Sequence, residues 1–505
     1  MRSEYSVKNS ITSIISNLVA IAIGFISQAL FIRILGAEYL GLNGLFTNIL
    51  TVLSFFELGI GNAIIFHLYR PISEKNTKKI KSLMRFYKRA YSIIALFVFF
   101  CGLIIMPFLP IIVGEISIDI NIYIVYAMFL ASTVSSYLLM YKRNLIYANQ
   151  KNYIINIIHI LYLILMNAFQ IIILYISKNY YLYLGVKIIF QILENIVNSI
   201  IANKLYPYIK EKNVEKLDLE TKNDIFSKVK ALVFHKIGTV VVTGTDNVLI
   251  SSFFGVKMVG IYSNYALVIN AIITLFGQII TSTTASVGNL LTSDNEKESF
   301  LVFEKVRFLN FILASIGSIG ILVAIKPFIS LWVGKKYILD DLVLLVLVIN
   351  CFQNIMKNTF NTFKDSGGIW VEDKYIPIIE SAANLILSII FLKLFGLAGV
   401  FLGTIVSSLI LWLYSYPKYV YKKLFKRQYT DYLKEFFEYL ILFIITATIT
   451  YAFSKVLSIE NNCLLDFIIK GMIAIAIPSI IFVIVFRKTE NFKYYLNLIR
   501  KTFQK

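Results

Sequence analysis

Long apolar runs recur along the whole 505-residue chain and constrain its fold more than any other feature. Hydrophobic residues make up 58% of the sequence and charged residues 15%, whereas soluble domains carry about 25% charged residues. Runs of roughly 20 residues are long enough to cross a hydrocarbon layer of about 30 Å as helices. Because a backbone in lipid must satisfy its own hydrogen bonds, we predict an all-α polytopic membrane protein.

About fourteen transmembrane helices are expected, one for each apolar run. The runs cover residues 10–34, 40–68, 90–113, 120–141, 153–177, 180–202, 231–254, 258–290, 308–332, 338–363, 374–394, 397–421, 436–456 and 463–486.

The loops between these runs alternate between long basic segments and short segments that contain few lysines or arginines. The basic set includes residues 70–89, 204–236 and 417–434 and the tail from Arg487. The positive-inside rule therefore places both termini in the cytoplasm. The net charge of +20 then reflects topology and contact with anionic lipids, and we expect no nucleic-acid partner.

Catalytic and metal-binding patterns are missing from the sequence. Its three cysteines, Cys101, Cys351 and Cys463, are far apart, and only three histidines occur. There is no G-x-x-x-x-G-K-[ST] phosphate loop, and the predicted outer loops are too short for a catalytic domain. We therefore expect a transporter rather than an enzyme, with no cofactor and no metal site.

A short glycine pattern occurs twice, each time in a predicted outer turn. Gly36-x-x-x-x-Gly41 follows the first run, and Gly255-x-x-x-x-Gly260 follows the seventh. The matching places of the two copies predict two six-helix lobes related by a repeat. We predict lobes at 1–204 and 231–421, a cytoplasmic linker at 205–230, and a terminal transmembrane pair with a basic tail at 422–505.

Three longer stretches also make the sequence recognisable. They are RILGAEYLGLNGLF with FFELGIGNAIIFHLYRPI (33–46 and 55–72), TDNVLISSFFG (245–255), and GGIWVEDKYIPIIESAANLILSIIFLKLFGLAGVFLGTIVS (367–407). The chain resembles the polysaccharide transporter family, which contains the O-antigen and capsule repeat-unit flippases. It shares a superfamily with the multidrug and toxin extrusion (MATE) pumps. The resemblance covers nearly the whole chain, in order.

This resemblance implies a MATE-like fold of two lobes that face each other across a cavity. It also implies a bacterial cytoplasmic membrane protein whose cargo is a polyprenyl-diphosphate-linked oligosaccharide. The cargo would pass from the inner to the outer leaflet by alternating access, driven by an ion gradient or the membrane potential. Membrane lipids and other polysaccharide-assembly membrane proteins are the expected partners, and we expect a monomer.

Polar side chains inside the predicted spans are the candidate functional residues, because a charge at the bilayer centre costs about 2.5–3.5 kcal/mol. The candidates for substrate binding are His67, Arg70, Lys187, His235, Lys236, Asn354, Lys357 and Asn358. The candidates for ion coupling or gating are Glu57, Asp246, Glu194 and Glu380.

Each candidate also has a structural explanation. Asp246 could form a buried hydrogen bond between helices, Arg70 could anchor the cytoplasmic interface, and Lys187 could reach outward to the lipid headgroups. The stripe of Asn354, Lys357 and Asn358 suits sugar hydroxyls and a phosphate, but it equally suits a helix end lined by water.

Three functions therefore remain open from the sequence. The first is a flippase for lipid-linked oligosaccharides, and the second is a cation-coupled multidrug exporter of the same superfamily. The third is a non-transporting scaffold for polysaccharide assembly. The mixture of lysine, histidine and arginine with acidic residues among the candidates favours an anionic headgroup, and so the flippase.

Overall fold

The computed structural model of the chain is helical, with no strand among the residues that it describes. It describes residues 2–211, 214–291, 295–369, 372–459 and 462–503. Within these ranges, side chains are not described for 2–7, 10, 55–56, 58–59, 62–63, 228, 230–243, 285, 289, 499 and 502–503. The prediction of an all-α chain is confirmed.

Contacts group the chain into two compact units, Met1–Ser263 and Asn264–Lys505. The first unit holds α1 (Arg2–Ile34), α2 (Ala37–Leu53), α3 (Phe55–Ser73), α4 (Thr77–Ile105), η1 (Met106–Phe108), α5 (Leu109–Val113), α6 (Ile122–Tyr137), α7 (Met140–Ala148), α8 (Asn152–Ser177), α9 (Tyr180–Leu205), η2 (Pro207–Lys210), α10 (Leu219–Phe254) and the start of α11 (Val256–Thr281).

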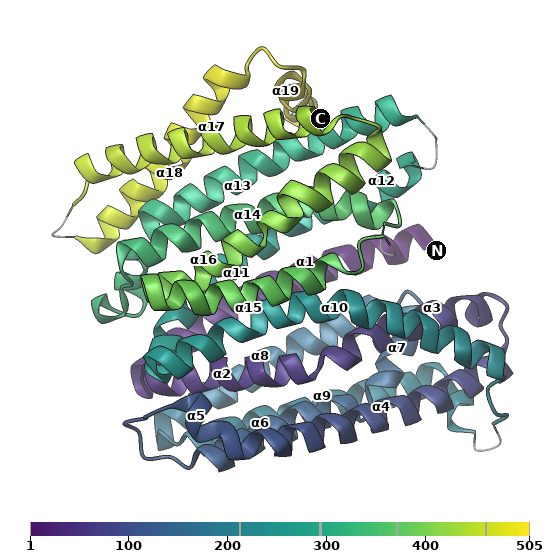
Figure 1. The fold of residues 1–505 in the computed structure, drawn as a ribbon. Helices are drawn as coiled ribbons and strands as arrows, with labels where there is room; N and C mark the ends of the chain where they lie inside the picture. The colour runs from purple at the N-terminus through teal and green to yellow at the C-terminus, as the bar shows by residue number, and fades with distance from the viewer. Residues whose placement is uncertain (1, 212–213, 292–294, 370–371, 460–461, 504–505) are drawn as a thin grey trace. The chain divides into compact units, whose positions relative to one another are not determined.

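The second unit begins within α11. It then holds α12 (Thr284–Leu291), α13 (Glu296–Trp332), η3 (Lys335–Tyr337), α14 (Asp341–Ser366), α15 (Ile376–Phe395), α16 (Leu397–Ser407), the wide helix η4 (Leu411–Leu424), α17 (Tyr429–Val456), α18 (Cys463–Phe486) and α19 (Glu490–Phe503). The helices of each unit run side by side along a common direction (Figure 1). The predicted division into lobes at 205–230 stays a prediction.

Each of the fourteen predicted spans lies mostly within helix. Among the described residues, eleven helices are long and apolar enough to cross a membrane, or up to twelve if the bent pair α6–α7 is one span. The predicted run 40–68 is divided between α2 and α3 at Ser54, and the run 231–254 lies inside α10. The count of about fourteen and the cytoplasmic termini remain predictions.

Asparagine and aspartate side chains mark where many of these helices begin. Asn121 accepts a hydrogen bond from the backbone N–H of Tyr123 at the start of α6, and Asn179 accepts one from Leu182 at the start of α9. Asn76, Asp218, Asn295 and Asn462 cap α4, α10, α13 and α18 in the same way. The caps satisfy N–H groups that have no partner inside the helix, and so set where the apolar segments start.

Large apolar side chains remain exposed along several helices, as expected for surfaces that face lipid. On α4 and α8, for example, Ile93 is 66% exposed and Tyr175 is 81% exposed. The terminal helices α17 and α18 pack against α13, where Ala474 joins Val323 and Ala324 in a small core. The predicted terminal pair therefore covers one side of α13.

The segment between α9 and α10 runs along the first half of α4. Lys79 Nζ lies 2.5 Å from Asp218 Oδ2, Lys81 Nζ lies 2.6 Å from Glu211 Oε2, and the Arg85 guanidinium donates to the Val214 carbonyl. The Lys79 ammonium lowers the pKa of the Asp218 carboxyl, and the Thr221 hydroxyl and N–H act in the same direction. This segment is therefore attached to the first unit rather than free.

In both copies of the glycine pattern, the first glycine makes a turn and the second allows two helices to approach closely. Gly36 and Gly255 adopt positive φ angles of 99° and 79°, which turn the chain into α2 and α11. The second glycines allow a close approach, since a Cβ at Gly41 would lie 1.9 Å from the Val256 carbonyl oxygen and one at Gly260 would lie 1.9 Å from that of Ala37. The first turns of α2 and α11 thus contact each other reciprocally; we call this the glycine contact.

Candidate transport site

Two helix breaks in the first unit meet at the same place. The chain bends at Ser54 between α2 and α3, where the Ser54 hydroxyl donates to the Leu50 carbonyl at 2.6 Å. The α6–α7 pair is bent by 43° just after Tyr137, and α3 packs against α7. Irregular backbone at membrane depth is tolerated where it lines a cavity, and broken helices are a common setting for transport sites.

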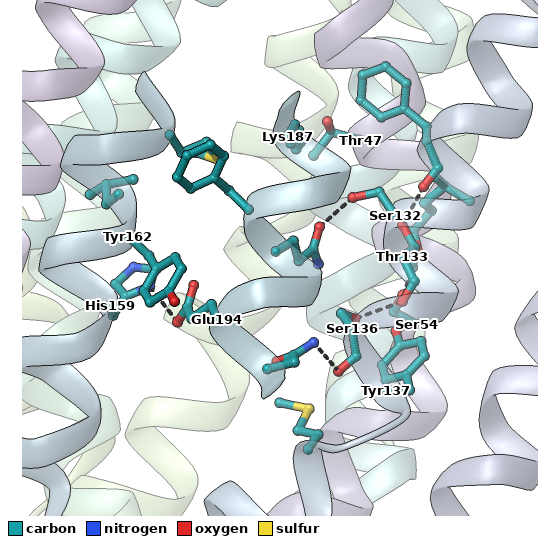
Figure 2. Close-up of a pocket in the computed structure, with 18 of the residues that line it drawn as sticks. Thr47, Ser54, Ser132, Thr133, Ser136, Tyr137, His159, Tyr162, Lys187 and Glu194 are labelled. Carbon is teal, nitrogen blue, oxygen red and sulfur yellow. Dashed lines mark hydrogen bonds and ion pairs between the residues drawn. The ribbon is translucent and has the colours of Figure 1, made fainter. Parts of the chain in front are cut away.

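A cavity of about 550 Å³ lies beside these breaks. Side chains of α2, α3, α6, α7, α8 and α9 line it, and most of the polar ones are hydroxyls and amides. Figure 2 shows Tyr162, His159 and Glu194 on one side and Ser54, Ser132, Thr133, Ser136 and Tyr137 on the other. We call this cavity the first-unit pocket.

Hydrogen bonds fix part of the pocket wall. The Ser132 hydroxyl donates to the Gln191 amide oxygen, and the Asn195 amide donates to the carbonyls of Ser135 and Ser136 at 3.3 and 3.4 Å. These bonds join α9 to the end of α6 that precedes the bend into α7. The wall is therefore held in place while its remaining hydroxyl groups face the cavity.

The charged residues of the pocket differ in their partners. His159 Nδ1 lies 3.1 Å from Glu194 Oε1 and the two form a pair between α8 and α9. Glu57 follows the Ser54 break and is close enough to Arg143 for an electrostatic interaction, without an ion pair at contact distance in the described part of the chain. Of the predicted coupling residues, Glu57 and Glu194 thus share one pocket.

Lys187 enters the same pocket from α9. Its Nζ lies 4.9 Å from the centre of the Phe129 ring, which offers a cation–π contact. Of the predicted substrate-binding residues, Lys187 is the one that lies beside Glu57 and Glu194 within the described side chains.

The second unit carries a polar stripe along α14. Asn354 Nδ2 donates to Asn350 Oδ1 at 2.9 Å, and Lys357 Nζ lies 3.5 Å from Glu380 Oε1 on α15. The Asn358 amide nitrogen is buried without a hydrogen-bond partner among the described residues. Four predicted residues, Asn354, Lys357, Asn358 and Glu380, are therefore close together in this unit.

The stripe continues into a buried triad near the end of α14. The Lys364 ammonium pairs with the Asp373 carboxylate, and the Ser415 hydroxyl donates to Asp373 Oδ1 at 2.9 Å. Lys364 and Asp373 are 8% and 1% exposed, so the pair is removed from solvent. This triad joins α14, the segment before α15, and η4.

The other predicted residues lie away from both groups. His67 Nε2 lies 3.0 Å from Asp224 Oδ2, which joins α3 to α10, while Arg70 is exposed and pairs with Glu74 at 2.8 Å. Asp246 on α10 has a buried carboxylate oxygen, Oδ1, without a hydrogen-bond partner among the described residues. His235 and Lys236 lie outside the side chains that the structure describes.

Several pocket residues were not singled out from the sequence. Arg143 was missed because it follows a predicted span. His159 lies inside the predicted span 153–177 but was missed because its importance comes from its partner Glu194 on another helix. Spacing could have indicated Gln191, since it lies between Lys187 and Glu194 on one helix face. Ser54 gave no signal, because a break within an apolar run has no fixed sequence pattern.

The described residues contain no group of three or more His, Cys, Asp or Glu side chains that could hold a metal ion. The absence of a metal site or cofactor stays a prediction.

The sequence profile of a family described as "Polysaccharide biosynthesis protein" matches residues 30–344, which is more than half of the chain. The chain belongs to this family. The resemblance inferred from the sequence is thereby confirmed. None of the curated protein sequences compared with the chain matches it.

Solved structures of membrane transporters share its fold. The lipid II flippase MurJ in an inward closed conformation superimposes with a TM-score of 0.66 at 16% identity, over 95% of this chain and 99% of MurJ. A multidrug resistance MATE family transporter in its inward-facing conformation gives a TM-score of 0.57 at 12% identity, over 80% and 95%. A mutant of the Vibrio cholerae MATE transporter VcmN gives 0.56 at 14% identity, over 82% and 97%.

These likenesses establish the fold, which is that of MurJ and the MATE transporters. The prediction of a MATE-like fold is confirmed.

Proposed function

We propose that this family member is a flippase for a polyprenyl-diphosphate-linked oligosaccharide repeat unit. It moves this cargo from the inner to the outer leaflet of the bacterial cytoplasmic membrane, for surface polysaccharide assembly. The observation that carries the proposal is the first-unit pocket, a cavity of about 550 Å³ lined by hydroxyls, amides and a few charges at two helix breaks. A site with this lining suits a hydrated, hydroxyl-rich cargo better than an apolar one.

In this proposal the pocket binds part of the glycan, while the polyprenyl tail remains in lipid. Hydroxyl and amide groups such as Thr133, Gln191 and Asn195 offer donors and acceptors to sugar hydroxyls. Aromatic rings such as Tyr162 and Phe190 offer faces on which sugar rings pack. The stripe of Asn354, Lys357 and Asn358 in the second unit is the second proposed contact for the cargo.

Glu57, Glu194, Asp246 and Glu380 are the proposed coupling or gating residues. A carboxylate in a water-filled cavity can bind a proton or a cation and so link cargo movement to an ion gradient. The membrane potential adds about 2.3 kcal/mol per charge per 100 mV. We propose alternating access by a monomer, with no enzymatic step.

The test is to deplete the protein in cells and identify polyprenyl-diphosphate-linked glycans by mass spectrometry. Accumulation of one completed repeat unit, together with loss of the surface polymer, is the expected result and would also name the glycan. An unchanged lipid-linked pool with increased sensitivity to cationic drugs would indicate a multidrug exporter, which the acidic pocket residues Glu57 and Glu194 would then serve.

Measuring the same lipid-linked glycans in variants of the protein separates a transporter from a scaffold. The candidate side chains are changed without changing the amount of protein, for example by Glu57→Gln and Lys187→Gln, neither of which breaks an ion pair at contact distance among the described residues. A scaffold would retain polymer synthesis in these variants, because assembly contacts would persist, whereas a flippase would accumulate the lipid-linked glycan.

A further inference from the structure

The first-unit pocket contains a lysine, Lys187, whose ammonium forms no ion pair at contact distance among the described residues. Lys187 lies on α9 within a predicted span, and its ammonium contacts the Phe129 ring at 4.9 Å from the ring centre. Among the described residues it has no carboxylate within ion-pair distance. Burying a charge in a membrane span is costly unless it meets a partner or water, so this ammonium needs an anionic or strongly polar partner in the cavity.

The two carboxylates of the pocket lie closer to other basic side chains than to Lys187. Glu194, two turns along α9 from Lys187, pairs with His159 at 3.1 Å on α8. Glu57 lies near Arg143, beyond the Ser54 break. Neither carboxylate forms an ion pair with Lys187 among the described residues, so its ammonium is available to a ligand.

The surroundings of Lys187 indicate which part of the cargo it would meet. Thr47, Ser132 and Gln191 line the same cavity, together with the Phe129 and Phe190 rings, which is a setting for a sugar ring. The volume of about 550 Å³ falls within the range of about 300–1,000 Å³ usual for small-molecule sites. A single ammonium is a point charge that suits one carboxylate, whereas a diphosphate is better held by forked arginines or several cations.

We infer that the first-unit pocket is a subsite for an acidic sugar residue of the cargo, with Lys187 binding its carboxylate. The inference rests on the proposed flippase function and deepens it, because it names a chemical class of glycan. A diphosphate on the same cargo could also supply an oxyanion to Lys187, and the experiment must therefore separate these two sources.

The probes are two farnesyl-diphosphate-linked disaccharides that differ in one group. One ends in glucuronic acid and the other in glucose, so both carry the same diphosphate. Binding to the purified full-length chain in lipid nanodiscs is measured by microscale thermophoresis. The wild-type protein should bind the glucuronic acid probe about 10- to 100-fold more tightly, as expected for a hydrogen bond to a charged partner.

Three variants decide the role of Lys187. Lys187→Gln should remove the preference and leave the affinity for the glucose probe unchanged, whereas Lys187→Arg should retain much of the preference. Lys204→Gln changes an exposed lysine at the other end of the same helix and should behave as wild type. Because Lys187→Gln is a polar replacement beside a cavity, it is expected to fold, and its unfolding temperature is recorded alongside.

Each other outcome overturns a defined statement. Equal loss of both probes in Lys187→Gln would place Lys187 on the diphosphate, and no change for either probe would make Lys187 structural; both results end the inference of an acidic-sugar subsite. If wild-type protein binds neither probe, the inference of an acidic-sugar subsite fails, while the flippase function itself is decided by the depletion experiment. Binding of both probes with equal affinity by wild type leaves that function standing and removes only the inference.

Discussion

Charged side chains occur inside the spans of both units, but the two units arrange them differently. In the first unit Glu57 and Lys187 line a cavity and lack an ion pair at contact distance within the described residues. In the second unit Lys357 pairs with Glu380, and Lys364 pairs with Asp373. The comparison teaches that the same residue types in apolar helices can line a cavity in one place and form ion pairs between segments in another.

The difference follows from local geometry. Two helix breaks keep the first-unit side chains apart and leave space between them, whereas α14 and α15 bring lysine and carboxylate side chains within 3.5 Å. A buried pair is expensive to break, because the remaining partner is left without compensation. An unpaired group beside a cavity can be changed with less effect on folding and more on binding. Four predictions test this contrast.

The largest expected effect concerns the buried triad of the second unit. Replacing Asp373 with Asn leaves the Lys364 ammonium buried and unpaired, and should lower the free energy of unfolding by about 3–5 kcal/mol. The measurement is thermal unfolding of the detergent-solubilised protein. The double variant Lys364→Met, Asp373→Leu removes both charges and should recover most of the loss. If D373N is as stable as wild type, the second unit does not depend on its ion pairs.

The next effect concerns activity rather than stability. Glu57→Gln should reduce delivery of lipid-linked glycan in cells at least about 10-fold, which corresponds to about 1.4 kcal/mol. Its free energy of unfolding should change by less than about 1 kcal/mol, as for substitutions outside tightly packed sites. Glu220→Gln, an exposed acidic change in the same unit, is the control. A large loss of stability with normal transport would erase the contrast between the units.

The glycine contact is a part of the first unit that should tolerate no added atom. Gly41→Ala and Gly260→Ala each place a Cβ against a backbone carbonyl and should each cost about 1–3 kcal/mol of stability. The two costs should not add in the double variant, because both changes break one contact. Gly185→Ala on α9, where a Cβ meets nothing within 4 Å, should be neutral or slightly stabilising. Full additivity would show two separate contacts.

The smallest effect belongs to an exposed pair. The folded pKa of Asp218 is lowered by Lys79, so the pair contributes stability above the unfolded pKa of Asp and loses it as pH falls through the folded pKa. Because both side chains are about half exposed or less, the gain should stay below about 1 kcal/mol. Asp218→Asn keeps a capping side chain for α10, and its unfolding temperature should approach that of wild type as pH falls below about 4.

An unchanged gap between wild type and D218N across that pH range would assign the difference to the cap instead of the charge. Asp218→Ala, which removes both, should lose about 1 kcal/mol more than D218N at neutral pH. Comparing this exposed pair with the buried triad measures how much solvent reduces the contribution of an ion pair to the free energy of unfolding.

Much of the fold could be predicted from the sequence because apolar runs and repeats are local or periodic signals. The glycine pattern at 36–41 and 255–260 predicted matching turns, and the structure shows a positive φ at the first glycine of each copy. The reciprocal contact could not be foreseen, since it depends on two segments meeting in space. The break at Ser54 was also invisible, because the apolar run continues through it.

The candidate site was predicted in part. Glu57, Lys187 and Glu194 were selected as charges inside spans, and they lie in one pocket. Arg70 and His67 were selected by the same reasoning but lie outside the pocket, where they pair with Glu74 and Asp224. The i,i+4 spacing could have indicated the first pair, but no spacing indicates the second. His159 was missed because its importance comes from Glu194, a neighbour on another helix. The sequence identifies charged residues inside the spans, but only the contacts between helices show which of them line the pocket.

The glycine contact has a consequence for how its two helices can separate. Each of the two first turns supplies one glycine and one carbonyl, so separating the turns breaks both halves of the contact. The two halves of the contact are therefore coupled through the same pair of turns. The contact is also made by backbone atoms, so neither pH nor salt changes the groups that form it.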